Sequence, residues 1–320
     1  MKKKLMCMLL TGVMAASMLA GCGNSEEPAE DTTTTTDEAT TDDAAAEETA
    51  EETAETSDFD AAEMIAVYSR EDGSGTRGAF IELFGIEQKD ESGEKVDYTT
   101  DEAVITNSTD VMLTSVSGDT YGIGYVSLGS LNDTVKAIQI DGTEATVENI
   151  KSGAYAIARP FNIATNGEVS EVAQDFINYI MSAEGQAVIT ENGYIGSDDA
   201  AAFESNGATG KVVVGGSSSV SPVMEKLIEA YKAVNAEAEI ELQTSDSTTG
   251  MTGASDGTLD IGMASRELKD SEVEAGLTAT QIAMDGIAVV VNQENPVENL
   301  SAETVKGIFT GEITEWSAAN

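Results

Sequence analysis

Three segments of the chain place glycine and hydroxyl residues between an expected strand and an expected helix. The first, Ser69–Gly78, follows a strand-like run at Ile65–Tyr68. Its glycines let the backbone turn so that N–H groups converge, its hydroxyls add donors at a helix N-terminus, and its arginine adds a planar, permanently charged fork. These residues are Gly73, Gly75, Ser74, Thr76 and Arg70. The combination favours a tetrahedral oxyanion as ligand, although this segment alone also fits a capped turn with a surface arginine.

The other two segments repeat this design. Gly215–Pro222 joins a strand to a helix, with a proline near the helix start where its missing N–H costs nothing. Ser245–Gly250 lies between another strand and an expected short helix. Either one alone indicates only a loop or an N-cap. Together, the three turns predict a single anion site in a crevice at the carboxyl ends of strands. None matches the P-loop pattern, which has a lysine after the glycine.

The composition excludes several classes of function. The 320 residues include 58 Asp and Glu, 16 Lys and Arg, and no His, for a formal net charge of −42. Without histidine there is no Ser-His-Asp or Cys-His nucleophile and no His-ligated zinc, so we expect no metal, no cofactor and no enzymatic activity. Such a negative surface repels a phosphate backbone, which argues against nucleic-acid binding.

The N-terminus predicts export. Residues 1–4 are basic and the run to Ala20 is apolar, which indicates a signal peptide over 1–21; the run is too short to favour a membrane span. Its end, Leu19-Ala20-Gly21-Cys22, resembles the lipobox of bacterial lipoproteins, which implies cleavage before Cys22 and lipidation of that thiol. An ordinary signal is the alternative. Because Cys7 leaves with the signal, the mature chain has no disulfide.

A long acidic segment follows. Residues 23–63 hold sixteen acidic and no basic positions with few large apolar side chains, so we expect 22–63 to be a disordered tether that acts as a spacer. An acidic binding motif is the alternative. The remainder, 64–320, keeps a net charge of −29. Bulk charge therefore cannot attract an anion, and binding must be local.

From residue 64 onward, short β-rich runs alternate with amphipathic helical patterns, which predicts an α/β architecture. The expected strands are 65–68, 121–126, 135–140, 211–214, 240–243 and 287–291, and the expected helices are 78–84, 169–181, 222–234 and 301–309. Trp316 is expected to be a packing residue.

Several motifs resemble the phosphate-binding lipoprotein of the bacterial phosphate ABC importer. They are Ser69–Phe80, Ser217–Pro222, Asp256–Leu268, Asp285–Val289 and Ile308–Trp316. The resemblance covers nearly all of residues 64–320. It implies a two-lobed periplasmic-binding-protein type II fold that closes about a hinge on one phosphate ion.

Carried over by position, the resemblance implies a set of phosphate-binding residues. Ser218 and Ser219 bind through backbone N–H and hydroxyl groups, and Ser247 binds from the third turn, while Arg70, Ser74, Gly75 and Thr76 close from the other lobe. Thr248, Ser265, Arg266 and Asp72 are further candidates, with Asp72 expected to hold Arg70 by a salt link.

One departure concerns the phosphate proton. Some family members have an aspartate after the Ala-Ser pair, and it accepts that proton; this chain has Arg266 there. Arg266 fits a direct ligand or a structural ion pair equally well. The candidate acceptors are Glu71, Asp72, Asp246 and Asp285, and the sequence does not choose among them.

The order of the motifs differs from the family's, in which the Ser-rich turn comes first. This order resembles a circular permutation, with residues 196–210 joining the family's usual ends; a rearranged or truncated gene model is the alternative. We then expect one lobe to combine 64–130 with 297–320 and to carry Arg70. The second lobe would be 131–296, with chain crossings near 128–134 and 292–297, and Met64 would lie close to Asn320.

The resemblance implies an extracellular, lipid-anchored solute-binding protein, monomeric, that delivers phosphate to the permease and ATPase subunits of an ABC importer. The alternatives are a receptor for another tetrahedral oxyanion such as sulfate, and a phosphate sensor or adhesion protein without transport. A secreted phosphatase is disfavoured because no histidine and no metal-ligand cluster is present.

Overall fold

The structure, a computed structural model, describes residues 59–319. The expected signal peptide, the lipidated Cys22 and the tether up to residue 58 lie outside the described residues. Within the described part, no helix is long and apolar enough to cross a membrane.

The described chain alternates strands and helices, which confirms the expected α/β class. The strands are β1 Ala66–Arg70, β2 Glu87–Lys89, β3 Lys95–Asp97, β4 Val104–Thr106, β5 Gly122–Ser127, β6 Val135–Ala137, β7 Gln139–Ile140, β8 Ala158–Asn166, β9 Gly210–Ser217, β10 Ala238–Ser245, β11 Ile261–Ala264, β12 Leu277–Asn292 and β13 Asn299–Leu300. The helices are α1 Gly75–Leu83, α2 Thr109–Ser117, α3 Val147–Lys151, α4 Glu171–Ile180, α5 Ala183–Glu191, α6 Ser221–Val234, α7 Ser247–Asp256, α8 Asp270–Glu274 and α9 Ala302–Phe309, with short 3₁₀ turns at Leu128–Ser130 and Trp316–Ala318.

One strand, β12, joins two groups of strands. Its first part, Leu277–Gly286, pairs with β8, and its second part, Ile287–Asn292, pairs with β5 and β6. The full strand order is β10-β9-β11-β8-β12-β5-β1-β4. On one side of β12, β9 runs parallel to β10 and β11; on the other, β1 runs parallel to β4 and β5.

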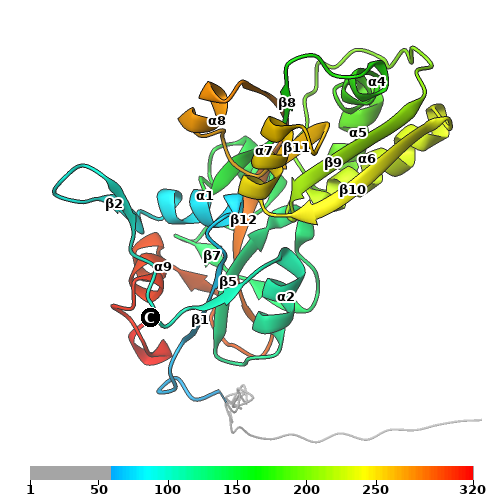
Figure 1. Ribbon diagram of the computed structural model, residues 1–320. Helices are drawn as coiled ribbons and strands as arrows, with labels where there is room; N and C mark the ends of the chain where they lie inside the picture. The colour runs from blue at the N-terminus through cyan, green and yellow to red at the C-terminus, as the bar shows by residue number, and fades with distance from the viewer. Residues whose placement is uncertain (1–58, 320) are drawn as a thin grey trace, which may run out of the picture. The chain divides into compact units, whose positions relative to one another are not determined.

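Two large hydrophobic cores define two lobes (Figure 1). The Ser218 lobe has a core drawn from residues 161–283, where α4, α5 and α6 pack on one face of the strands; α7 covers a smaller apolar cluster that includes Met251 and Ala264. The Arg70 lobe has a core drawn from 65–157 and 287–319, to which α1 and α9 contribute, and α2 covers a second cluster with β5 and β6. Each lobe therefore has helices on both faces of its strands.

The lobes divide at other residues than the sequence predicted. Ile138, Ile140 and Tyr155 pack in the core of the Arg70 lobe, together with Ile287 and Val291. The sequence-based boundaries at 131 and 296 place these residues in the opposite lobe. The chain instead crosses within β8, near residues 158–160, and within β12, near 284–286. A crossing inside a long strand has no loop composition to reveal it, whereas residues 128–134 and 292–297 are polar turns inside one lobe.

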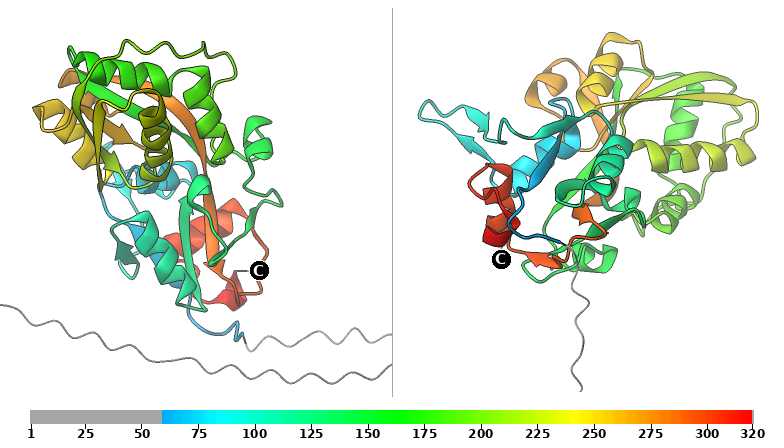
Figure 2. Two further views of the ribbon diagram at one scale, coloured as in Figure 1. Left: turned by 90° about the vertical axis from the view of Figure 1, so that its right-hand side faces the viewer. Right: turned by 90° about the horizontal axis from the view of Figure 1, so that it is seen from below.

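The start and the end of the described chain lie side by side (Figure 2). Asn320, which we expected close to Met64, lies outside the described residues. Met64 forms an antiparallel bridge with Glu315, and the Ile65 N–H donates to the Thr314 carbonyl at 2.8 Å. Trp316 is 1% exposed and its indole donates to the Tyr121 carbonyl at 3.1 Å, so it is a packing residue as expected.

The expected linker, residues 196–210, connects α5 to β9 within the Ser218 lobe. It packs on that lobe through the Phe203 ring, whose centroid lies 5.1 Å from that of Tyr179. Ser205 and Asn206 donate to the Asp175 carboxylate at 2.9 and 2.8 Å. The segment is therefore a surface crossing on one lobe.

Candidate functional site

Four helices begin at the same place between the lobes. Each follows a strand: α1 follows β1, α2 follows β4, α6 follows β9 and α7 follows β10. Because β1 is parallel to β4 and β9 to β10, the carboxyl ends of each pair lie at one edge. Ser74, Ser108 and Asp246 cap three of these helices by accepting a backbone N–H, and α6 has Pro222 in its first turn. Unsatisfied N–H groups and the positive ends of four helix dipoles thus converge.

Seven side-chain hydroxyls gather at these helix starts, and we call them the hydroxyl cluster. They are Thr76, Thr109, Ser217, Ser218, Ser219, Ser247 and Ser265, all at most 7% exposed. The Thr76 hydroxyl lies 2.7 Å from that of Ser219, which belongs to the other lobe. Within the Ser218 lobe, the Ser217 hydroxyl donates to that of Ser265 at 3.0 Å. The cluster is therefore buried and bridges the two lobes.

Gly75 allows the closest approach of the lobes. A Cβ atom at this position would lie 2.5 Å from the Ser247 hydroxyl and 2.8 Å from the Ser265 hydroxyl. Both distances are shorter than any ordinary contact of a Cβ atom. The glycine is therefore required so that the start of α1 can lie against the start of α7.

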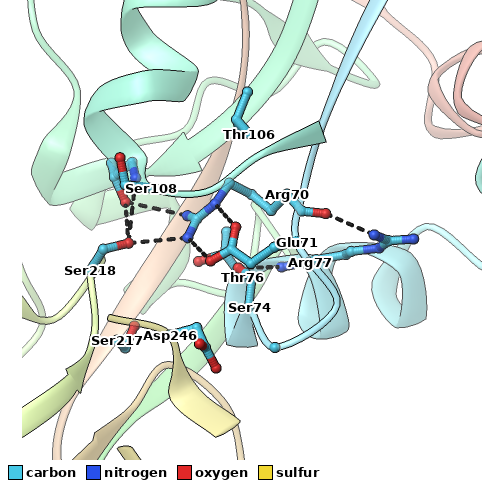
Figure 3. Close-up of polar contacts among 12 residues, drawn as sticks. Arg70, Glu71, Ser74, Thr76, Arg77, Thr106, Ser108, Ser217, Ser218 and Asp246 are labelled. Atoms are coloured by element: carbon cyan, nitrogen blue, oxygen red, sulfur yellow. Dashed lines mark hydrogen bonds and ion pairs between the residues drawn. The ribbon is translucent and has the colours of Figure 1, made fainter. Parts of the chain in front are cut away.

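Arg70, at the end of β1, supplies the positive charge of the site (Figure 3). Its side chain is 3% exposed and its guanidinium donates to Ser218 Oγ at 3.1 Å and to Thr109 Oγ1 at 3.4 Å. Its other contact is bidentate, to both carboxylate oxygens of Glu71, at 2.8 and 2.7 Å. Glu71 therefore holds the Arg70 guanidinium in an orientation in which it can donate to Ser218 of the other lobe.

The expected salt link between Asp72 and Arg70 is wrong. Asp72 is 96% exposed in its side chain and pairs with Arg77 at 2.9 Å, while Glu71 pairs with Arg70. The physical reason is the turn that follows β1: it carries Asp72 outward to solvent while the Glu71 side chain folds back along the guanidinium. Arg77 supports the same turn by donating to the Arg70 carbonyl at 2.8 Å.

The backbone N–H of Ser218 is also used differently from the expectation. It donates to the Ser245 carbonyl at 3.0 Å, so the hydroxyl is the group of Ser218 that faces the cluster. Ser74 lies beside the cluster as the N-cap of α1, where its hydroxyl accepts the Arg77 N–H at 3.3 Å. The structure thus brings together all seven residues that the resemblance implied, with this change in the role of Ser218.

Arg266 forms a structural ion pair. Its guanidinium makes two contacts with Glu272, at 2.7 and 2.8 Å, and a longer one of 3.4 Å with Thr248 Oγ1. Burial acts to raise the pKa of Glu272. Hydrogen bonds from Arg266 and from the Lys269 N–H outweigh burial and hold the pKa below its ordinary value. Of the remaining candidates, Ser265 is in the cluster, and Thr248 donates its N–H to the Gly73 carbonyl of the other lobe at 3.2 Å.

The four candidate proton acceptors occupy different places. Both Glu71 oxygens face Arg70, and Asp72 points to solvent. Asp246 caps α7, accepting from the Thr249 N–H at 2.9 Å and its hydroxyl at 2.6 Å. Asp285 lies where β12 passes from one lobe to the other, and it pairs with Arg159 of the neighbouring strand β8. Glu71 and Asp246 are thus the two carboxylates beside the site.

Sequence reasoning missed Thr109. This residue opens α2 after the strand β4, in the segment Asn107-Ser108-Thr109. The signal was of the same kind as in the other turns, hydroxyl residues between a strand and a helix, but this turn has no glycine and β4 is only three residues long. Ser217, which the motif included, was not singled out either.

The arrangement can bind a compact anion. It offers hydroxyl donors, helix N-termini and one buried guanidinium, and the residues that the structure describes contain no cluster of metal-ligating side chains. Tetrahedral oxyanions match such a set of convergent donors.

Comparison with known proteins gives the same family in sequence and in structure. A family model described as "PBP superfamily domain" matches residues 23–184 and 201–320. A protein of Streptococcus agalactiae serotype V named "Phosphate-binding protein PstS 2" is 52% identical over 99% of this chain and 99% of its own length. A protein of the same name from Streptococcus pneumoniae serotype 4 is 46% identical over 80% of this chain and 88% of its own.

A solved structure agrees. The crystal structure of a phosphate-binding protein of a phosphate ABC transporter from Streptococcus pneumoniae has 45% sequence identity and a TM-score of 0.64. The match covers 80% of this chain and the whole of that one.

Proposed function

The chain belongs to the PBP superfamily and, within it, to the phosphate-binding proteins, and we propose that it holds inorganic phosphate at the hydroxyl cluster. It is the solute-binding protein of an ABC importer, which captures phosphate between two lobes and delivers it to the permease and ATPase subunits. The proposed site comprises Arg70, Ser74, Gly75, Thr76, Ser218, Ser219 and Ser247.

One observation carries this assignment: four helix N-termini and a buried arginine meet at hydroxyls from both lobes. A phosphate ion there would receive charge-assisted hydrogen bonds from each lobe and would thereby link them. The site lies in a domain rich in negative charge, so short-range donors supply the attraction.

Calorimetric titration of the purified chain with phosphate, sulfate and arsenate tests the proposal. We expect phosphate to bind tightly and sulfate to bind weakly or not at all. Tight sulfate binding without heat from phosphate would identify a receptor for a different oxyanion. In a second titration, Ser218→Ala should weaken phosphate binding by about 10-fold, because a buried donor to an anion is lost. Ser115→Ala, near the C-terminal end of α2, is the control and should bind as the parent does.

We also propose that the chain has no catalytic role and acts as a monomer. In support, the sequence contains no histidine, and the cluster hydroxyls contact arginine, N–H groups and one another. None of these contacts supplies the base that a serine nucleophile requires. Incubation with a chromogenic phosphate ester should release no product, and sedimentation should give the mass of one chain.

As the solute-binding protein of an importer, the chain works outside the cytoplasmic membrane. We propose that a lipid on Cys22 holds it there, because the sequence Leu19-Ala20-Gly21-Cys22 follows a basic start and an apolar run. Labelling of cells with radioactive palmitate should mark the parent and not Cys22→Ser. The variant should appear in the culture medium.

We propose further that the segment order is a circular permutation. Two observations support it: Met64 bridges to Glu315, so the first and last described segments lie together, and residues 196–210 cross the surface of a single lobe. A rearranged chain that begins near residue 208, connects 320 to 59 through a short glycine linker and ends near 205 should fold and bind phosphate. Failure of this chain to fold would argue against the permutation.

A further inference from the structure

Thr109, which the sequence did not indicate as a site residue, contacts three of the proposed phosphate-binding residues. It is 4% exposed and is the first residue of α2. Its hydroxyl lies 3.3 Å from that of Ser218 and 3.4 Å from that of Ser219, both in the other lobe. In its own lobe it accepts from Arg70 Nη1 at 3.4 Å. All three partners belong to the site.

The hydrogen-bond capacity of these groups determines their direction. A hydroxyl has one donor and two acceptor positions, and a guanidinium only donates. Ser218 Oγ receives Arg70 Nη2 at 3.1 Å and the Thr109 N–H at 3.4 Å, so both of its acceptor positions are used. Its own proton must therefore point away from these two donors.

The same reasoning applies to Thr109. Because Arg70 occupies one acceptor position of Oγ1, the Thr109 proton points away from the guanidinium, toward Ser219. From Ser219 the row of hydroxyls continues to Thr76 at 2.7 Å. Arg70 thus orients the hydroxyls on its side of the site as donors.

We propose that Thr109 is a phosphate-binding residue that brings the N-terminus of α2 to the anion and donates its hydroxyl to an unprotonated phosphate oxygen. This inference rests on the proposed function and adds a residue that neither the motifs nor the resemblance indicated. It also assigns an orientation: the oxygens of phosphate without a proton face Arg70, Ser218 and Thr109, since this end of the site offers donors.

The test compares two buried threonines of one segment. Thr109→Val removes the hydroxyl with little change in shape, and we expect phosphate affinity to fall about 10- to 100-fold, as for the loss of a charge-assisted hydrogen bond. Thr109→Ser keeps the donor and should bind within about threefold of the parent. Thr106→Val is the matched control: Thr106 is 2% exposed, donates to the Ser69 carbonyl at 3.0 Å and points away from the cluster (Figure 3), so its loss should leave affinity unchanged.

Calorimetry gives the affinities, and thermal unfolding without phosphate shows whether a variant is merely less stable. The inference is overturned if Thr109→Val binds as tightly as the parent, if Thr106→Val weakens binding equally, or if Thr109→Ser fails to restore affinity. A parent chain that binds no phosphate would overturn the proposed function and this inference together. A parent that binds while Thr109→Val matches it would overturn this inference alone.

Discussion

Two buried arginines of this protein have opposite surroundings. Arg70 and Arg159 are both 2% exposed. The guanidinium of Arg70 donates to Glu71, Thr109 and Ser218. Arg159 lies where β8 passes from one lobe to the other, and its Nη2 is 3.2 Å from Asp285 Oδ2. Its three guanidinium nitrogens nevertheless make no hydrogen bond in the described structure. Ser127, Ser130 and Tyr194 also have buried hydroxyls without a partner there.

The difference shows in the pKa values of Arg159 and Asp285. Burial raises the pKa of Asp285 to about 6, although Arg159 opposes the shift. Burial also lowers the pKa of Arg159 to about 10, against the pull of Asp285. Both shifts indicate that desolvation outweighs the attraction within the pair. The polar groups of the anion site thus satisfy one another's hydrogen bonds. The buried pair of Arg159 and Asp285 instead lowers the stability of the folded protein.

The largest effect should come from removing the buried pair of Arg159 and Asp285, the crossing pair. The double variant Arg159→Met/Asp285→Leu removes both charges together. Because desolvation outweighs the attraction within the pair, we expect a gain of about 1–4 kcal/mol in the free energy of unfolding at pH 7. Urea denaturation measures this change.

The control for this experiment is Asp72→Leu, which breaks an exposed ion pair with Arg77 and should change stability by less than about 1 kcal/mol. If the double variant is no more stable than the parent, beyond the change seen with the control, the crossing pair has no special cost, and the contrast with Arg70 fails.

A smaller effect should appear with pH. Because the folded-state pKa of Asp285 is raised from 3.8 to about 6, the folded protein holds this proton more tightly than the unfolded chain. The contribution is complete below about pH 4 and is lost as the pH rises through 6, a change of about 3 kcal/mol. Because Asp285→Asn has no carboxyl group to titrate, the free energy of unfolding of the parent should fall by this amount relative to that of Asp285→Asn between pH 4 and pH 7. A difference that stays constant over this range would show that Asp285 titrates normally.

The same substitution at both arginines sharpens the comparison. Lysine cannot make the bidentate contact with Glu71, so Arg70→Lys should weaken phosphate binding about 10-fold or more. Arg159→Lys should reduce stability while leaving phosphate affinity within about threefold of the parent. Calorimetry and urea denaturation on the two variants separate these outcomes. Equal losses of affinity would mean that the crossing pair controls binding as much as the site does.

Much of the fold follows from periodicity in the sequence. The expected helix at 222–234 matches α6, Ser221–Val234, because its apolar residues recur on one face and Pro222 marks its start. The expected helices at 169–181 and 301–309 match α4 and α9 within two residues. The strand β8, Ala158–Asn166, was not predicted, since Arg159, Pro160 and Asn162 interrupt its apolar pattern. Of these residues, Arg159 pairs with Asp285, and Asn162 donates to the Arg266 carbonyl at 2.9 Å.

The site was predictable to the extent that it depends on turns. Three of the four helix starts were recognised from glycine and hydroxyl residues after a strand. The partner of Arg70 was not, because Glu71 and Asp72 are adjacent carboxylates and only the course of the turn decides which one folds back. The crossings were misplaced for a similar reason: a strand that passes from one core to another is continuous in sequence.

The two arginines agree in one respect, their burial, and the smallest predicted effect follows from it. Mobile ions screen exposed charges over about 8 Å at physiological salt, but they cannot approach a guanidinium that is 2% exposed. The folded part carries a net charge of −29, whose long-range repulsion of an anion is weakened by salt. Raising sodium chloride from 0.05 to 0.5 M should therefore change phosphate affinity by less than about threefold, with any change toward tighter binding. A tenfold loss in this titration would mean that exposed cations, rather than Arg70 and the helix N-termini, attract the ligand.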